Sequence, residues 1–116
     1  MRIDKFSFGR ITIDRVVYEH DVIIDAGRIR KRKKKASKKF RDMFGHTPLS
    51  ADEEIPWKCS RLVIGTGAYG NLPVMDSVKQ EAARREIDLV IVPTAEAIKA
   101  LRKASKGTNA ILHVTC

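Results

Sequence analysis

The amino-acid sequence predicts an α/β fold: a single three-layer domain with a central mixed β-sheet, two main helices in βαβαβ order and an additional amino-terminal β-hairpin. Three observations lead to this prediction. The length of 116 residues suits one domain. In the second half, apolar strand-like runs alternate with helical stripes, an order that requires crossover connections between parallel strands. In the first third, β-branched residues alternate with polar ones, as in half-buried strands.

The first third is expected to consist of strands. Residues 10–14 alternate apolar and polar side chains with a period of two, and Gly9 and Asp14 are expected in the flanking turns. Two further β-branched runs, residues 16–18 and 22–24, predict either one long strand or two. These strands must extend the main sheet or add a layer beside it.

A short helix is expected to begin at Ser50. The four residues from Ser50 to Glu53 fit a capping box, and Pro56 limits the helix to a turn or two. The acidic residues 52–54 are therefore interpreted as the amino terminus of a helix, where its dipole favours negative charge, before they are considered a catalytic carboxylate set.

The second half is expected to alternate strands with helices. The predicted strands are residues 62–64, 87–92 and 110–114, and the predicted helices run over about 74–86 and from Thr94 to a stop at Gly107.

The positive charge of the chain is concentrated in one segment. The formal net charge is +9, and residues 28–41 contain ten of the 23 basic residues and no acid. The rest of the chain holds 13 basic and 14 acidic residues and is nearly neutral. Like charges repel one another, so residues 28–41 are expected to form an extended or mobile basic surface loop within the single domain 1–116.

Three interpretations of the basic segment remain open: a solvated loop, an electrostatic binding surface for nucleic acid or an acidic protein, and a membrane-surface segment. The last is the weakest, because the segment lacks a strong apolar face. Binding to nucleic acid would be weak and independent of sequence, because it would depend on phosphates. The residues expected to carry it are Arg28, Arg30, Lys31, Arg32, Lys33, Lys34, Lys35, Lys38 and Lys39.

The sequence GTGAYG at residues 65–70 matches the dinucleotide-binding fingerprint. The next predicted strand ends without the acidic residue that would bind the ribose, and the following helix is expected to begin only near Pro73. We therefore expect no cofactor, and we expect Gly65 and Gly67 to be required by the backbone. Exposed amides in this loop could still hold a small anion. The residues of such a ligand cleft, at the carboxyl end of the parallel strands, would be Gly65, Gly67, Tyr69, Arg41 and His46.

The cysteine and histidine residues give no site by spacing alone. Two cysteines, Cys59 and Cys116, are too few for a disulfide framework, which predicts a reduced, cytoplasmic chain. Together with His46 and His113 they could form a metal site or a Cys/His pair, but no third group that would orient such a pair is evident. No metal site and no catalytic residue is therefore predicted. No run is long and apolar enough for a membrane span or a secretory signal.

Several motifs carry a family resemblance: FGRI at 8–11, HDVII at 20–24, LVIGTG at 62–67, PTAEA at 93–97 and LHVTC at 112–116. Together they resemble the family of small α/β domains of unknown function that includes the adipogenesis-associated domain protein and a mitochondrial respiratory complex I assembly factor. The resemblance spans nearly the whole chain. It implies a central mixed sheet whose terminal strand runs antiparallel to others, and it implies no known reaction.

Three functional hypotheses follow. The favoured one is a non-catalytic binding or assembly and regulatory domain whose partner is another protein, with a homodimer as a further expectation. The alternatives are an anion-binding or enzymatic cleft at residues 65–70, and nucleic-acid binding through residues 28–41. A deep pocket with convergent polar groups beside residues 65–70 would favour the cleft, and a flat surface there would count against it.

Overall fold

The computed structural model describes residues 1–104 and 106–116. Within them lie eight strands and four helical segments. The strands are β1 (Ile3–Ser7), β2 (Arg10–Ile13), β3 (Val16–Tyr18), β4 (Val22–Asp25), β5 (Arg28–Lys31), β6 (Arg61–Thr66), β7 (Asp88–Val92) and β8 (Thr108–His113). The helical segments are the 3-10 helix η1 (Lys35–Phe40) and the α-helices α1 (Arg41–Phe44), α2 (Asp76–Arg84) and α3 (Thr94–Arg102). The predicted α/β class is confirmed.

The strands form two sheets. A small antiparallel sheet has the order β1-β2-β3, and the main sheet has the order β5-β4-β8-β6-β7. In the main sheet β6 runs parallel to β7 and β8, as the crossover argument predicts, whereas β4 runs antiparallel to β5 and β8. The sheet is therefore mixed. The alternatives left open for the first third are resolved: β3 completes the added layer, and the separate strand β4 extends the main sheet.

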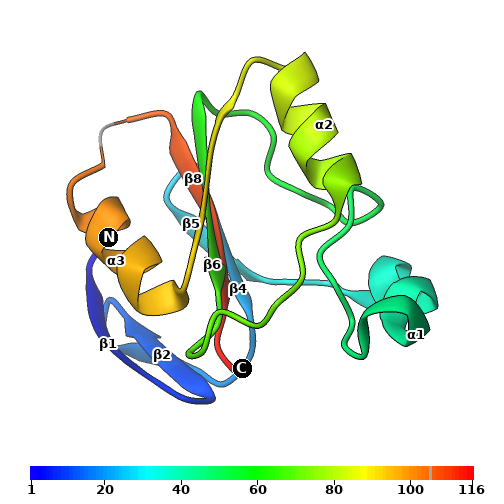
Figure 1. The fold of residues 1–116 in the computed structure, drawn as a ribbon. Helices are drawn as coiled ribbons and strands as arrows, with labels where there is room; N and C mark the ends of the chain where they lie inside the picture. Colours follow the sequence, from blue (N-terminus) through cyan, green and yellow to red (C-terminus); the bar gives the residue numbers. More distant parts are fainter. Residues whose placement is uncertain (105) are drawn as a thin grey trace.

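The main sheet separates two hydrophobic cores. Figure 1 shows α2 on one side of this sheet and α3 on the other, where the small sheet also lies. Side chains alternate between the faces with the period of two of a strand. In β4, Val22 and Ile24 join the core beneath α3 and the small sheet, whereas Ile23 joins the core beneath α2. The predicted three-layer arrangement follows from this alternation.

The basic segment 28–41 is not a loop, so that prediction was wrong. Its first four residues form β5, which pairs with β4 from Val22↔Lys31 to Asp25↔Arg28. The remaining residues include η1 and the start of α1. An edge strand tolerates charged side chains because one of its sides has no neighbouring strand. Ile29, between two arginines, packs against the core and anchors the strand.

The helix expected at Ser50 is absent, so that prediction was wrong as well. Ser50 to Glu53 form a turn, in which the Asp52 amide donates to Ser50 Oγ at 3.3 Å. The Glu53 carboxylate does not reach back to a helix amino terminus, because it pairs with the guanidinium of Arg32. An ion pair with a buried cation therefore replaces the capping box.

The two main helices begin close to their predicted positions. α3 begins at Thr94 but ends at Arg102, before Gly107. The Thr94 hydroxyl does not cap its own helix: it accepts a hydrogen bond from the Gly67 amide at 2.8 Å and donates to the carbonyl of His113 at 2.6 Å. This side chain joins the glycine loop to the end of β8. Among the described residues, no helix combines the length and the apolar character that a membrane span requires.

Candidate functional site

The glycine loop at residues 65–70 packs tightly against its own chain. Gly67 has φ +105°, and a Cβ at this position would lie 2.5 Å from the carbonyl carbon of Cys116. A Cβ at Gly65 would lie 2.9 Å from Thr94 Oγ1. Real Cβ atoms do not approach other atoms this closely, so both glycines are required by the backbone, as the sequence predicts.

The amides of this loop are used within the fold. The Gly67 amide donates to Thr94, the Ala68 amide donates to the carbonyl of Thr115 at 2.7 Å, and the Asn71 amide donates to the carbonyl of Cys116 at 2.8 Å. A phosphate cradle needs several free amides that converge on one point. The fingerprint at residues 65–70 is therefore a connection between β6, α3 and the carboxyl-terminal segment.

A cleft of about 350 Å³ lies beside this loop. The segment with η1 and α1 forms one wall, and residues 71–72 and 113–116 form the other. The side chains important for its chemistry are Lys34, Lys38, Arg41, His46, Asn71 and His113.

The five residues proposed from sequence for a ligand cleft separate into two groups. Arg41 and His46 line the cleft, whereas Gly65, Gly67 and Tyr69 are not among its lining residues. Tyr69 instead points to solvent with 71% of its surface exposed, and its ring lies 5.9 Å from that of Phe8. The structure therefore brings two of the five residues together at one cleft and leaves the other three outside its lining.

The cleft is strongly basic. Among its described lining residues there is no Asp or Glu. Lys34, Lys38 and Arg41 are exposed, and in the described part of the chain none of them takes part in an ion pair. The neighbouring Lys39, by contrast, pairs with Asp52 at 2.8 Å. Cations that share a concave surface without counter-charges raise the local concentration of anions.

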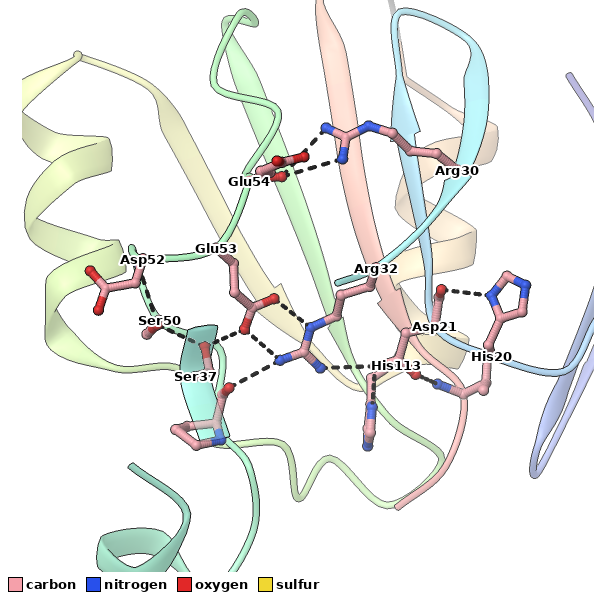
Figure 2. A network of polar contacts seen from close by, with 12 residues as sticks. His20, Asp21, Arg30, Arg32, Ser37, Ser50, Asp52, Glu53, Glu54 and His113 are labelled. Carbon is pink, nitrogen blue, oxygen red and sulfur yellow. Dashed lines mark hydrogen bonds and ion pairs between the residues drawn. The ribbon is translucent and has the colours of Figure 1, made fainter. Parts of the chain in front are cut away.

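Arg32, which also contributes to the cleft lining, is the centre of a buried polar network (Figure 2). Its Nε and Nη2 atoms each donate to the Glu53 carboxylate at 2.8 Å, and Nη1 donates to Asp21 at 2.9 Å. Nη2 also donates to the carbonyl of Pro48 at 3.0 Å. Burial by itself lowers the pKa of Arg32, but Glu53 and Asp21 reverse this effect and raise it.

This network fixes the position of η1. Ser37, in the middle of η1, is fully buried, and its hydroxyl donates to the Glu53 carboxylate. The hydroxyls of Ser37 and Ser50 lie 2.7 Å apart. Because the network holds the backbone of η1, it also positions Lys34 and Lys38 at the cleft.

Asp21 connects Arg32 to the end of β8. Its carboxylate accepts hydrogen bonds from His113 Nδ1 at 2.8 Å, the Val114 amide at 3.0 Å and Arg32. Burial raises the pKa of Asp21, but the hydrogen bond and charge of His113, with Val114 and Arg32, outweigh burial and lower this pKa to about 2.

The other ring nitrogen of His113, Nε2, lies 3.1 Å from Thr115 Oγ1. No group that would orient this imidazole is evident in the sequence. Asp21 is that group, and it lies 92 residues away in sequence. No local spacing could have indicated it.

The comparisons with known proteins bear on this fold. A family model described as "Protein of unknown function (DUF498/DUF598)" matches residues 3–108. The chain belongs to the DUF498/DUF598 family. The resemblance seen in the sequence is thereby confirmed at the level of a family of unknown function, and no curated protein matches the chain.

Solved structures share this DUF498/DUF598 fold. A conserved hypothetical protein from Pyrococcus horikoshii OT3 is 32% identical with a TM-score of 0.86, and the match covers 100% of both chains. The protein MT938 is 28% identical with a TM-score of 0.73, and the match covers 98% of this chain and 97% of that one. A Bartonella henselae protein described as an outer membrane protein is 14% identical with a TM-score of 0.66, covering 98% and 94% of the two chains, and shows the fold alone.

The nine basic residues proposed for nucleic-acid binding do not form one surface in this DUF498/DUF598 domain. Arg32 is buried and unavailable to a phosphate, which corrects that part of the prediction. Arg30 contacts Asp25 and the carbonyl of Glu54. Lys34 and Lys38 face the cleft, whereas Lys33, Lys35 and Lys39 line a separate hollow that also contains acidic residues. The remaining two, Arg28 and Lys31, are exposed on β5.

The cysteines lie apart. Cys116 lines the cleft, while Cys59 packs against the core beneath α2. Burial raises the pKa of the Cys59 thiol, which makes it a poor nucleophile. Neither cysteine is in a disulfide, and no group of three or more metal-binding side chains occurs within residues 1–104 and 106–116.

Proposed function

We propose that this domain binds a small anionic ligand, of the size of a phosphate ester or a polycarboxylate, in the basic cleft. The observation that carries the proposal is the set of three exposed cations, Lys34, Lys38 and Arg41, that converge on the cleft without acidic partners in the described part of the chain. The sequence favours a protein-binding domain, with an anion-binding or enzymatic cleft at residues 65–70 and nucleic-acid binding through residues 28–41 as alternatives. The cleft supports ligand binding because its polar groups converge.

The geometry suits a small ligand. A volume of about 350 Å³ lies at the lower end of the range for small-molecule pockets. His46 and Asn71 add groups that can donate hydrogen bonds to ligand oxygens. The cations are held by the backbone of η1 and α1, which is anchored through Ser37 and Arg32, so less conformational entropy is lost on binding.

The glycine loop takes no part in the proposed site. Because its amides donate to the chain itself, the ligand is held by side chains rather than by a backbone cradle. We therefore expect NAD and ATP to show no micromolar binding through the residues 65–70 fingerprint. Calorimetry at millimolar nucleotide on Lys34→Ala/Lys38→Ala, which lacks two of the cleft charges, measures this.

The test compares two double variants from the same segment. Lys34→Ala/Lys38→Ala removes two charges that face the cleft, and Lys33→Ala/Lys35→Ala removes two that face away from it. With inorganic pyrophosphate as the probe in isothermal titration calorimetry, we expect the first variant to bind at least about tenfold more weakly, because charge-assisted hydrogen bonds to the anion are lost. The control variant is expected to stay within about twofold of the unmodified protein, because screened charges outside the cleft contribute little.

Two results would contradict the proposal. If unmodified protein shows no saturable heat with pyrophosphate, the cleft does not bind anions. If both variants lose affinity equally, the whole segment acts as diffuse charge, as in sequence-independent binding of nucleic acid. Titration with duplex DNA at matched salt would then identify that function.

A further inference from the structure

Thr115, His113 and Asp21 form a hydrogen-bonded chain at the side of the basic cleft. Thr115 Oγ1 lies 3.1 Å from His113 Nε2, and His113 Nδ1 lies 2.8 Å from Asp21 Oδ2. Thr115 and His113 both line the cleft. A hydroxyl, an imidazole and a carboxylate in this order activate the nucleophile in several unrelated hydrolase folds. The geometry therefore has the elements of nucleophilic catalysis.

The hydrogen positions follow from the state of Asp21. Arg32 Nη1 and the Val114 amide both donate to its carboxylate, and its lowered pKa of about 2 keeps it ionised at neutral pH. An ionised carboxylate only accepts hydrogen bonds, so His113 Nδ1 is the donor. In the neutral imidazole, Nε2 then carries the lone pair and accepts the hydrogen of the Thr115 hydroxyl. This is the tautomer that a general base requires.

The charges around His113 also bear on the proposed reaction. Arg32 contributes one positive charge to the buried network, while Glu53 and Asp21 contribute two negative charges. The network without His113 therefore has a net charge of −1. A proton taken up at Nε2 brings the group to neutrality, which stabilises the imidazolium formed during a reaction.

We propose that Thr115 is a nucleophile, with His113 as its general base, for acyl transfer from esters that carry an anionic group. The anionic part of this substrate class rests on the proposed function of the cleft. Thr115 and His113 are the catalytic residues, because they exchange the reacting proton and form the new bond. Asp21 is a positioning residue that acts through His113.

The reaction is a hydrolysis in two steps. Thr115 Oγ1 bonds to the ester carbonyl carbon as its proton moves to His113 Nε2, and the bond to the leaving oxygen then breaks with return of that proton to the departing alcohol. Water next attacks the acyl-threonine and gives one proton to Nε2. Thr115 Oγ1 departs with that proton, so that ester and water yield acid and alcohol.

Lys34 is placed to stabilise the charge that develops on the carbonyl oxygen. It lines the cleft, and it also lines the adjoining hollow of about 260 Å³, which Asp21 and Thr115 share. A cation beside the reacting carbon favours the tetrahedral oxyanion over the neutral ester.

The first experiment uses p-nitrophenyl acetate, a neutral activated ester. The unmodified protein should give a burst of p-nitrophenol, and mass spectrometry should locate an acetyl group on the peptide containing Thr115. Thr115→Ser should retain the burst, because it keeps the hydroxyl. Thr115→Val, which keeps the shape of the side chain, should reduce the burst rate at least about a hundredfold, as expected when a nucleophile is removed.

The proposal is overturned if the unmodified protein gives no burst above the buffer rate, if folded Thr115→Val gives the same burst, or if the acetyl group is found on another residue. Circular dichroism and thermal unfolding establish that each variant is folded before its rate is compared.

The role of Asp21 is tested by its effect on the imidazole. Asp21→Asn offers an amide that can donate to Nδ1, which would move the ring proton to Nε2 and remove the acceptor for Thr115. The ¹⁵N chemical shifts of the His113 ring should show this exchange, and the burst rate should fall with it. An unchanged tautomer with a reduced rate would contradict the positioning role.

The anionic preference is tested separately, so that its failure is distinguishable from failure of the catalytic residues. The mono-p-nitrophenyl ester of adipic acid should acylate the protein faster than the acetate ester, and Lys38→Ala/Arg41→Ala should bring the ratio of the two rates toward one. The control Lys33→Ala/Lys35→Ala, which lies outside the cleft, should leave this ratio within about twofold. A burst with no preference would overturn the anionic substrate class but leave Thr115 as nucleophile, whereas the pyrophosphate titration decides the proposed function by itself.

Discussion

Two regions of the chain carry the residue types that bind phosphates: the glycine loop at residues 65–70 and the basic segment at residues 28–41. In the glycine loop, the Gly67 and Ala68 amides, with the Asn71 amide just beyond it, donate within the chain. In the basic segment, Arg32 is likewise used internally, but Lys34, Lys38 and Arg41 lie at a cleft and form no ion pair among residues 1–104 and 106–116. The comparison teaches that a phosphate-binding motif indicates a ligand site only where its hydrogen-bond donors are not already used by acceptors of the fold itself.

Arg32 and the exposed lysines of the basic segment are expected to differ sharply in their contribution to the free energy of unfolding. Arg32→Ala leaves Glu53 and Asp21 as buried charges without their cation, so we expect a loss of about 3–5 kcal/mol in the free energy of unfolding. Urea unfolding followed by circular dichroism measures this loss. If Arg32→Ala lowers the free energy of unfolding no more than substitution of an exposed lysine does, the basic segment is a solvated surface segment and Arg32 does not hold the fold together.

In the glycine loop, the largest effect is expected at Gly67. Gly67→Ala places a Cβ 2.5 Å from the carbonyl carbon of Cys116 at φ +105°, and we expect a cost of about 2–3 kcal/mol in thermal or urea unfolding. Gly9→Ala is the matched control, because Gly9 has φ +86° but no atom within 4 Å of its would-be Cβ. An equal loss of unfolding free energy in the two variants would show that the close approach to Cys116 adds nothing to the cost of the positive φ.

Asp21 joins Arg32 of the basic segment to the end of β8, and it makes stability depend on pH. The pKa of Asp21 is lowered from 3.8 to about 2 in the folded chain, so its stabilisation is complete above about pH 4 and is lost as pH falls toward 2. The difference corresponds to about 2 kcal/mol. Unfolding of Asp21→Asn in urea between pH 2 and 5 should lack this part of the pH dependence. The groups that face Asp21 are His113, Arg32, Lys31, Lys34, Glu19 and the neighbouring His20.

The smallest effect is expected for the lysines that face away from the cleft. Lys33→Ala/Lys35→Ala should change the free energy of unfolding by less than about 0.5 kcal/mol, because both side chains are exposed and make no ion pair in the described residues. Differential scanning calorimetry of this variant beside Lys34→Ala/Lys38→Ala measures it. A marked loss confined to the first variant would mean that the outward face of η1, rather than the cleft face, is structural.

The second half of the fold could be predicted because its signals are local. The apolar runs at residues 62–64 and 87–92 and the start of α3 at Thr94 depend on side chains a few positions apart. The errors came from long-range pairing. The sequence from Ser50 to Glu53 matches a capping box. Glu53 instead pairs with the buried guanidinium of Arg32, which lies 21 residues away in the sequence.

The candidate site was harder to predict for the same reason. Arg41 and His46 were assigned to a ligand cleft expected at the carboxyl end of the parallel strands, and they do line the cleft beside the glycine loop. The pairing of His113 with Asp21 spans 92 residues, and it arises because β4 and β8 are neighbours in the sheet. Only the strand order makes these two side chains meet.

The position of β8 in the main sheet has a consequence for how the chain folds as it is made. β8 lies between β4 and β6, yet it follows both in sequence. Until the ribosome has released β8, the hairpin of β4 and β5 and the pair of β6 and β7 remain separate halves with open inner edges. Such edges invite pairing with other chains, so a nascent chain stalled before residue 108 is expected to be the species most exposed to aggregation.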